Sequence, residues 1–500
     1  MDFISGEDRG QTLLLPDSLE DYVGEDNPVR VIDAFVNGLE MRGLGFSGAS
    51  PNDTGRPSYD PKDMLKLYVY GYMYRARSSR RLETETKRNL EVIWLLGRLS
   101  PDHKTISRFR RDNGKALKNT FRAFVGLCAD LGLYGKELVA IDGSKFKAVN
   151  GRERNFSEKK LRDRIKRMDA KIEEYMKELE SNDKAECGAD GGKSAAEITE
   201  IVRGLTARKE QYQKFAKELA ETGETQKSLT DADSRLMKTK DGVEVCYNVQ
   251  TAVDSKHKLI AEFEVTNRVN DYNQLRPMAA KAADALGTAA FAAVADAGYD
   301  STRDIVGCVR DGFEVHVAGT DFDACVPSDA PGGEITGHKD GRCVYYPERN
   351  VALCPMGKVL YPKFYSKSKK RGVFHNNKEC KSCACKCTGK TRHRHEVAMA
   401  EAAFTKTFDD RDLHVRQVRI KAEAEAATVG ERKSIVEHPF GTIKRAMDGA
   451  YCLTKGLANV AGEFSLTFLA YNIKRAIGIL GCAGLAEAVG RNALAAGLAR

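Results

Sequence analysis

Leu138-Val139-Ala140-Ile141-Asp142-Gly143-Ser144 is the stretch that decides the fold of this chain. Four apolar residues in succession predict a buried β-strand, and the Asp-Gly pair predicts where that strand ends. Residues 290–299 repeat the pattern, with an apolar run that ends in Asp296 and is followed by Gly298. Two buried strands of this kind indicate an α/β fold in which they lie parallel.

The segments between and after these two stretches predict the rest of the sheet. Residues 245–253 and 259–265 alternate between apolar and polar side chains around a turn, which indicates an antiparallel β-hairpin. A helix is expected over 272–286, another near 301–311, and a further strand over 313–318. The order predicts a mixed α/β sheet.

Residues 153–242 interrupt the sheet pattern with two amphipathic segments separated by a Gly- and Asp-rich turn. Apolar residues in both segments follow a spacing of four and three, which predicts an antiparallel helical hairpin with a coiled-coil seam. The hairpin is either an inserted structural element or an arm for a partner or for DNA. The first segment carries Leu161, Ile165, Met168, Ile172, Tyr175 and Leu179.

Residues 1–131 are predicted to form a helical domain. Helices are expected from Pro61, over 83–96 and over 102–111, with a Gly-containing turn before the last. That outline is typical of a helix-turn-helix, whose second helix can enter the major groove. The alternative is a small bundle with a solvated basic face. The residues expected to face DNA are Arg108, Arg110 and Arg111.

Composition and charge restrict the class of protein only loosely. The 500 residues include 80 basic and 71 acidic side chains, and this net charge of +9 permits nucleic-acid binding without requiring it. No run of eighteen apolar residues occurs, so no membrane span is expected. The first residues lack the layout of a signal peptide. These features predict a soluble, cytosolic protein.

Residues 321–395 are rich in cysteine and basic residues and are predicted to be a second insertion. Cys380 and Cys383 have the spacing of a zinc-ligand pair. Cys354 and either Cys385 or Cys387 could complete a structural zinc site. The alternative is a set of reduced thiols, since the thirteen cysteines lack the arrangement of a secreted disulfide framework.

Glu437 is a single carboxylate in a basic and apolar stretch, 436–444, that follows a helix expected over 396–426. Lys433 and Lys444 lie on the same face of a helix as Glu437. By itself this pattern fits a surface ion-pair face or a carboxylate kept ionised for a metal. Asp142 and Asp296 each fit a turn residue when taken alone. Together, the three acids predict a shared site for divalent metal ions.

Other acids compete for a place in such a site, namely Asp231, Asp233, Asp254 and Asp271.

Four blocks of this chain resemble those of bacterial insertion-sequence transposases of the DDE superfamily. They occur in the same order and contain the three acids. The blocks are residues 141–145 (IDGSK), 247–254 (YNVQTAVD), 295–299 (ADAGY) and 436–444 (VEHPFGTIK).

The resemblance implies a fold and a set of site residues. It implies an RNase H-like mixed sheet, with Asp142, Asp296 and Glu437 as ligands of Mg²⁺, which Mn²⁺ could replace. Lys444 matches the lysine of the family's Tyr, Arg, Glu, Lys signature, while Lys433, beside Arg432, stands at the arginine position and is expected to contact DNA. The domains would be a helical DNA-binding domain (1–131), the core (136–152, 243–320 and 396–480), the hairpin insertion (153–242) and the Cys-containing insertion (321–395).

The resemblance also implies a function. The protein would bind the terminal inverted repeats of its element and the target DNA, cut the DNA and transfer the strand. A homodimer is expected in the synaptic complex, in the bacterial cytosol at the nucleoid. Two alternatives remain open, an RNase H-like nuclease without strand transfer and a catalytically inactive DNA-binding protein.

Overall fold

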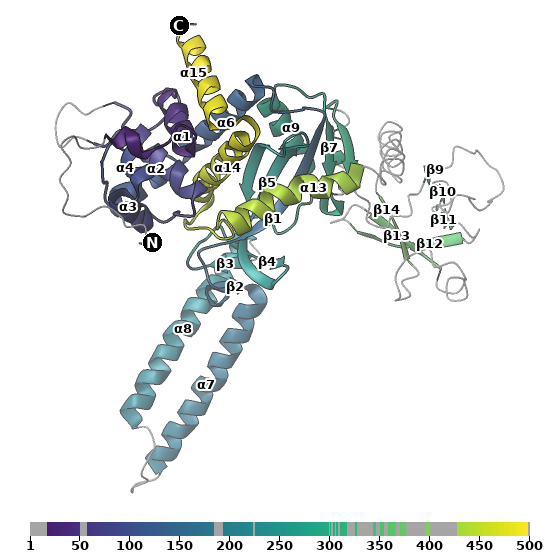
Figure 1. Ribbon diagram of the computed structural model, residues 1–500. Coiled ribbons are helices and arrows are strands. Elements are labelled where there is room, and N and C mark those ends of the chain that lie inside the picture. Colours follow the sequence, from purple (N-terminus) through teal and green to yellow (C-terminus); the bar gives the residue numbers. More distant parts are fainter. Residues whose placement is uncertain are drawn as a thin grey trace, which may run out of the picture.

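The computed structural model describes residues 18–50, 58–184, 194–223, 226–299 and 428–498, with parts of 301–317 and six short segments between 326 and 400. In the centre lies a six-stranded mixed sheet with helices around it (Figure 1), which confirms the predicted α/β class. The strand order is β4-β5-β1-β7-β8, and β6 also pairs with β5. These strands are β1 (Leu138–Lys147), β4 (Arg235–Thr239), β5 (Gly242–Asp254), β6 (Ile260–Thr266), β7 (Ala292–Ala295) and β8 (Glu314–Val317).

β1 pairs in opposite senses on its two sides. Residues 138–140 run parallel to 292–294 of β7, and residues 139–147 run antiparallel to 246–254 of β5. The predicted parallel pair and the predicted β5–β6 hairpin are therefore confirmed. β1 does not end at Asp142, however, but continues to Lys147 because β5 supports it along this whole length.

The helical character predicted for the region before the sheet is confirmed, with one correction. The single helix predicted over 83–96 is two helices, because the side chain of Asn89 accepts hydrogen bonds from the N–H groups of Glu91 and Val92 and so starts a new helix. The domain contains α1 (Pro28–Asn37), α2 (Pro61–Met73), α3 (Ser79–Arg88), α4 (Leu90–Leu95), α5 (His103–Asp112) and α6 (Gly114–Asp130).

Helix α14 (Leu457–Leu480) joins this domain to the sheet. It packs against α2 and α6 on one side and β6 on the other (Figure 1). A Cβ on Gly462 would stand 2.9 Å from the Cα of Gly114, so α14 and α6 cross in close contact. The rings of Phe468 and Phe263 of β6 are 4.7 Å apart. Among the described residues, no helix is both long and apolar enough to cross a membrane.

The predicted helical hairpin is confirmed and projects from one end of the sheet (Figure 1). Its helices are α7 (Glu158–Lys184) and α8 (Ala195–Thr222), and its base is a short pair of strands, β2 (Asn155–Ser157) and β3 (Gln226–Ser228). A small apolar cluster fixes the base where the hairpin leaves the sheet. It consists of Phe156, Leu161, Phe215 and Leu219.

In the sequence, a second sheet follows β8 and precedes the C-terminal helices, and it corrects one prediction. Residues 396–400, expected to begin a long helix, form a strand that pairs antiparallel with 371–375; residues 401–427 lie outside the described part of the chain. The order is β14-β13-β12-β11-β10-β9. These strands are β9 (Val326–Pro327), β10 (Val344–Tyr346), β11 (Val351–Leu353), β12 (Val359–Ser366), β13 (Arg371–His375) and β14 (Glu396–Ala400).

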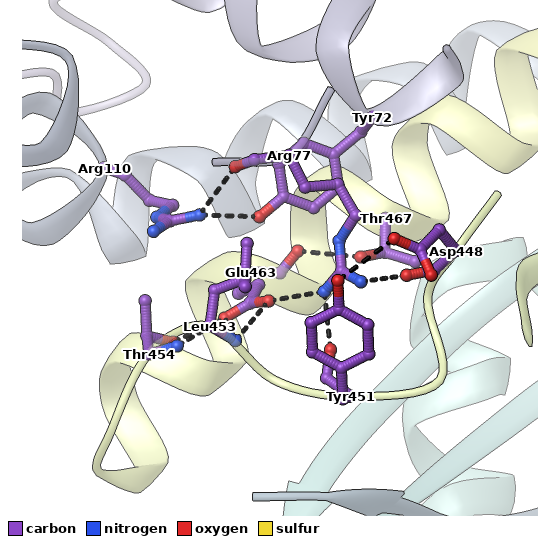
Figure 2. Close-up of polar contacts among 9 residues, drawn as sticks. All are labelled: Tyr72, Arg77, Arg110, Asp448, Tyr451, Leu453, Thr454, Glu463 and Thr467. Atoms are coloured by element: carbon purple, nitrogen blue, oxygen red, sulfur yellow. Dashed lines mark hydrogen bonds and ion pairs between the residues drawn. The ribbon is translucent and has the colours of Figure 1, made fainter. Parts of the chain in front are cut away.

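A buried ion pair fixes α14 to the helical domain, as Figure 2 shows. Arg77, which follows α2, donates from Nη2 to Glu463 of α14 at 2.7 Å and to the Tyr451 carbonyl at 2.6 Å. Glu463 also accepts hydrogen bonds from the N–H groups of Leu453 and Thr454. Both charged side chains are almost completely buried. The pair therefore holds the loop before α14 as well as the helix itself.

We predict that Glu463→Ala lowers the free energy of unfolding by roughly 3–5 kcal/mol, because it leaves the Arg77 guanidinium buried without its counter-charge. Denaturant unfolding followed by circular dichroism measures the change. Glu487→Ala is the control, since Glu487 forms only an exposed pair with Arg491 and its loss should change stability by less than about 0.5 kcal/mol. Equal effects of the two substitutions would contradict the role given to Glu463.

Candidate active site

Asp142 and Asp296 stand at the same edge of the sheet. The pairing of β1 with β7 stops at Ala140, and Asp296 follows directly after β7. Burial, and then the neighbouring Asp296 carboxylate, raise the pKa of Asp142 to about 7. Asp142 Oδ1 accepts a hydrogen bond from the N–H of Gly143, and Asp296 Oδ1 accepts one from Gly298. Two carboxylates held this close favour a cation between or beside them.

Glu437 lies on α13 (Thr428–Gly441), which crosses this edge of the sheet. It lines the same cleft as Asp142 and Asp296, a hollow of about 1110 Å³. Its side chain is 64% exposed, and its nearest cation is the Lys433 ammonium at 3.9 Å. Glu437 therefore shares a cleft with the two aspartates, and its one ion pair among the described residues is this long, exposed contact.

Lys444 enters the cleft because the helix changes its winding after Pro439. α13 continues through Pro439 and becomes a π-helical turn over Thr442–Ala446. Such turns often occur at functional sites. Nζ of Lys444 donates to Ser144 Oγ at 2.7 Å and to the Lys145 carbonyl, both on β1. Burial lowers the pKa of Lys444, because the buried ammonium is only partly solvated.

Arg432 of α13 lies beside Asp142. Its Nη1 is 3.7 Å from Asp142 Oδ2, and its buried Nε finds no acceptor among the described residues. The contact partly neutralises Asp142, in agreement with its place among the groups that lower that pKa. An incompletely paired guanidinium next to the acids is well placed for a phosphate group.

The three arginines predicted to face DNA from α5 do not share one environment. Arg108 is exposed, and Arg111 is exposed and paired with Asp112 at 2.7 Å. Arg110 is buried and donates to the hydroxyl of Tyr72 at 2.9 Å, so its assignment as a DNA contact is wrong for this conformation (Figure 2). Helix geometry contained the signal, since Arg110 follows the buried Ile106 by four residues and lies on the same face.

Of the four competing acids, only Asp271 is near the cleft. The Asp271 charge is among the smaller causes that raise the pKa of Asp142. Asp231 bonds to the Tyr247 hydroxyl, Asp233 to the N–H of Leu457, and Asp254 to backbone N–H groups at the far end of β5.

The sequence analysis also missed two lysines that line the cleft, one on β4 and one in the turn after it. They are Lys238 and Lys240.

The donor set of the cleft fits a hard divalent cation. Carboxylate oxygens are the ligands that Mg²⁺ prefers, and one or two of them suffice because Mg²⁺ keeps several waters. Within the described residues, no three acidic, His or Cys side chains are close enough to share one ion. The fit therefore rests on pairs of carboxylates around the cleft.

The predicted zinc site falls largely outside the described residues. Cys380, Cys383 and Cys387 lie there, as does Cys385, and only Cys354 is described, as a buried cysteine on the second sheet. Zinc binding stays a prediction.

Comparison with family models gives two matches. Residues 17–112 match the transposase domain DUF772, and residues 353–477 match a transposase DDE domain. The chain belongs to the DDE transposases. The DDE match contains Glu437, Arg432 and Lys444, and it begins inside the segment predicted as the Cys-containing insertion. A search of curated proteins found no match, and a search of solved structures found none either.

Membership of this family has consequences for the fold and chemistry. The DDE domain implies an RNase H-like core and DNA binding, and DDE transposases generally use divalent metal ions. The DUF772 match ends at residue 112, which is the last residue of α5. The transposase therefore has its helical domain in front of the sheet that carries both aspartates.

We predict that Asp142→Asn stabilises the metal-free transposase at pH 8. Because the pKa of Asp142 in the folded protein is raised from about 3.9 to about 7, its ionisation opposes folding, and this loss of stability grows as the pH rises through that window. The gain is a few kcal/mol at most, at about 1.4 kcal/mol per pKa unit. Thermal unfolding in EDTA measures it. At pH 4 the gain should largely vanish, and an equal gain at both pH values would contradict the raised pKa.

Proposed function

We propose that this transposase binds the ends of its own element and carries out metal-dependent DNA strand cleavage and strand transfer in the cleft between β1 and α13. The observation that carries the proposal is the meeting of Asp142, Asp296 and Glu437 around one cleft with basic side chains on its rim. Glu437 lies within the matched DDE domain, which supports its assignment as the third acid.

The acids would hold the metal, with Mg²⁺ the expected ion and Mn²⁺ a substitute. Bound there, the ion would neutralise phosphate charge and activate the attacking oxygen. Asp142 and Asp296 are oriented for this role by the backbone N–H groups of Gly143 and Gly298. Arg432, now beside Asp142, would be released toward a DNA phosphate once a cation takes over the charge of Asp142.

The rim of the cleft would follow the DNA backbone. Its basic side chains come from β1, from β4 and the turn after it, and from the π-helical turn, so they extend along the cleft and are not confined to one point. Phosphate contacts of this kind position DNA without reading its sequence. The residues are Lys145, Lys147, Lys238, Lys240, Lys444 and Arg445.

Recognition of the element ends is assigned to the helical domain. Arg108 and Arg111 lie three residues apart on the exposed face of α5 and could enter a groove. Lys433 is also exposed and close to the cleft. Pairing of two element ends requires two copies of the active site, so we expect a homodimer in the synaptic complex, acting at the nucleoid in the bacterial cytosol.

We predict that Asp142→Asn, Asp296→Asn and Glu437→Gln each reduce strand cleavage by more than about 100-fold, because even outer partners of metal ligands are worth about 10- to 100-fold. The assay uses duplexes that carry the DNA flanking the gene, with Mg²⁺ or Mn²⁺, and separates cut from joined products on gels. End binding, measured by gel shift, should persist. Full activity in any of the three variants would refute the site, and cutting without joining would favour a nuclease.

We predict that Lys238→Ala combined with Lys240→Ala weakens DNA binding and flattens its salt dependence. Each lost phosphate contact should change the slope of log K against log salt by about 0.9. Fluorescence anisotropy between 50 and 300 mM salt measures the slope. Arg491→Ala, which removes an exposed charge on α15 (Cys482–Leu498) outside the cleft lining, is the control with an unchanged slope.

A further inference from the structure

Asp271 is held in place beside the cleft by two amide side chains. It lies in the turn between β6 and α9 (Leu275–Leu286), and its Oδ1 accepts hydrogen bonds from Asn248 Nδ2 and Gln250 Nε2, each at 2.7 Å. Asn248 and Gln250 are two residues apart on β5, so both side chains leave the same face of the strand. The Tyr299 hydroxyl donates to Gln250 Oε1 and so fixes which end of that amide faces Asp271.

Gly143, the residue after Asp142, makes room for this arrangement. Gln250 is its direct partner in the β1–β5 register. A Cβ on Gly143 would overlap with Asp271 Oδ1 and Gln250 Nε2, and it would stand 3.0 Å from Asn248 Oδ1. Any side chain at 143 would therefore push Asp271 away. The absence of a side chain there lets the turn approach β1 behind the catalytic aspartate.

Among the described residues, Asp271 Oδ2 accepts no hydrogen bonds like those that hold Oδ1. Its nearest cation is Lys145 Nζ, 3.9 Å from Oδ2. Asn248 Oδ1 lies in the same cradle and is a fully buried acceptor to which none of the described residues donates a hydrogen bond. An oxygen with spare acceptor capacity next to an unpaired amide oxygen is the environment that a hydrated cation satisfies, through its charge and through the O–H groups of its waters.

Gly298 lies against both this oxygen and Asp296. The point where a Cβ of Gly298 would stand is 2.9 Å from Asp296 Oδ1 and 3.6 Å from Asp271 Oδ2, and Gly298 itself is exposed to solvent. The two carboxylate oxygens thus border the same solvent-exposed stretch of backbone, where the absence of a side chain lets both come close. A pair of carboxylates with waters completing the shell suits Mg²⁺.

We propose that Asp271 is a fourth acidic residue of the metal site, and that Asp271 and Asp296 together form a cation position over Gly298, next to the one that Asp142 and Asp296 share. This inference rests on the proposed metal-dependent function. In this arrangement the Asn248–Gln250 pair orients Asp271. The absence of side chains at Gly143 and Gly298 lets the carboxylates come close enough to share a cation.

Binding of Mn²⁺ to the full-length protein without DNA tests the proposal, with free Mn²⁺ counted by electron paramagnetic resonance. Asp271→Asn keeps an oxygen that accepts from Asn248 and Gln250 but removes the charge, and we expect at least about 10-fold weaker binding at one site with no loss of thermal stability. Gly298→Ala places a Cβ against Asp296 Oδ1 and should weaken both positions that use Asp296. Asp271→Cys should lose cleavage in Mg²⁺ and regain it in Mn²⁺ or Cd²⁺, which accept sulfur ligands.

Asp233→Asn is the matched control, because it removes one carboxylate charge at the start of α14, outside the cleft, where asparagine also caps a helix well. Its Mn²⁺ affinity should equal that of the unmodified protein. Unchanged affinity in Asp271→Asn, with reduced affinity in Asp142→Asn and Asp296→Asn, would overturn the role of Asp271 alone. Unchanged affinity in all three variants would overturn the metal-dependent function together with this inference.

Discussion

The buried ion pair between Arg77 and Glu463 connects the helical domain to α14 and to the loop that precedes α14. Glu463 anchors the start of α14 and, through the N–H groups of Leu453 and Thr454, the loop that returns from the π-helical turn. The same loop is joined to the end of β1, where the N–H of Lys147 donates to the Ala450 carbonyl and Lys147 accepts from Cys452. The chain that follows Glu437 and Lys444 is thereby fixed to the end of β1.

The site lies where β1 is no longer paired with β7 but is still paired with β5. Pairing with β5 keeps Asp142 on a regular strand, while the end of β7 opens the edge beside it. Like charges gather at this opening, and burial makes them costly without a cation. Small residues beside each aspartate, Gly143 and Gly298, then let a turn and solvent come close. The acidic centre is surrounded by a basic rim, which matches a phosphate-rich substrate on a divalent ion.

The sequence was sufficient for features set by local periodicity. Apolar runs before Asp142 and Asp296 predicted two parallel strands, and the four-three spacing predicted the helical hairpin. Residues 396–400 were taken for helix because glutamate, alanine and methionine favour it locally, yet pairing with β13 overrides that preference. Arg110 was misplaced because the prediction followed the basic composition of α5, although the spacing of four from Ile106 puts Arg110 on the buried face. The metal, the DNA contacts and the third acid's role remain predictions.

Asp271 was one of four further acids that the sequence offered, and spacing could not single it out, since nothing in the sequence fixes how close the turn after β6 comes to β1. The one related signal in the sequence was the alternation of Asn248 and Gln250, which indicates a polar face on a buried strand.

The position of α14 also sets the timing of folding during synthesis. The helical domain is made first, but the helix that packs against α2 and α6 comes roughly 330 residues after α6 ends. At about 5–20 residues per second, the ribosome takes on the order of 20–60 s to supply it. During that interval the apolar faces of α2 and α6 lack their native cover, so the nascent chain is open to chaperones and to other chains until its C-terminal helices emerge.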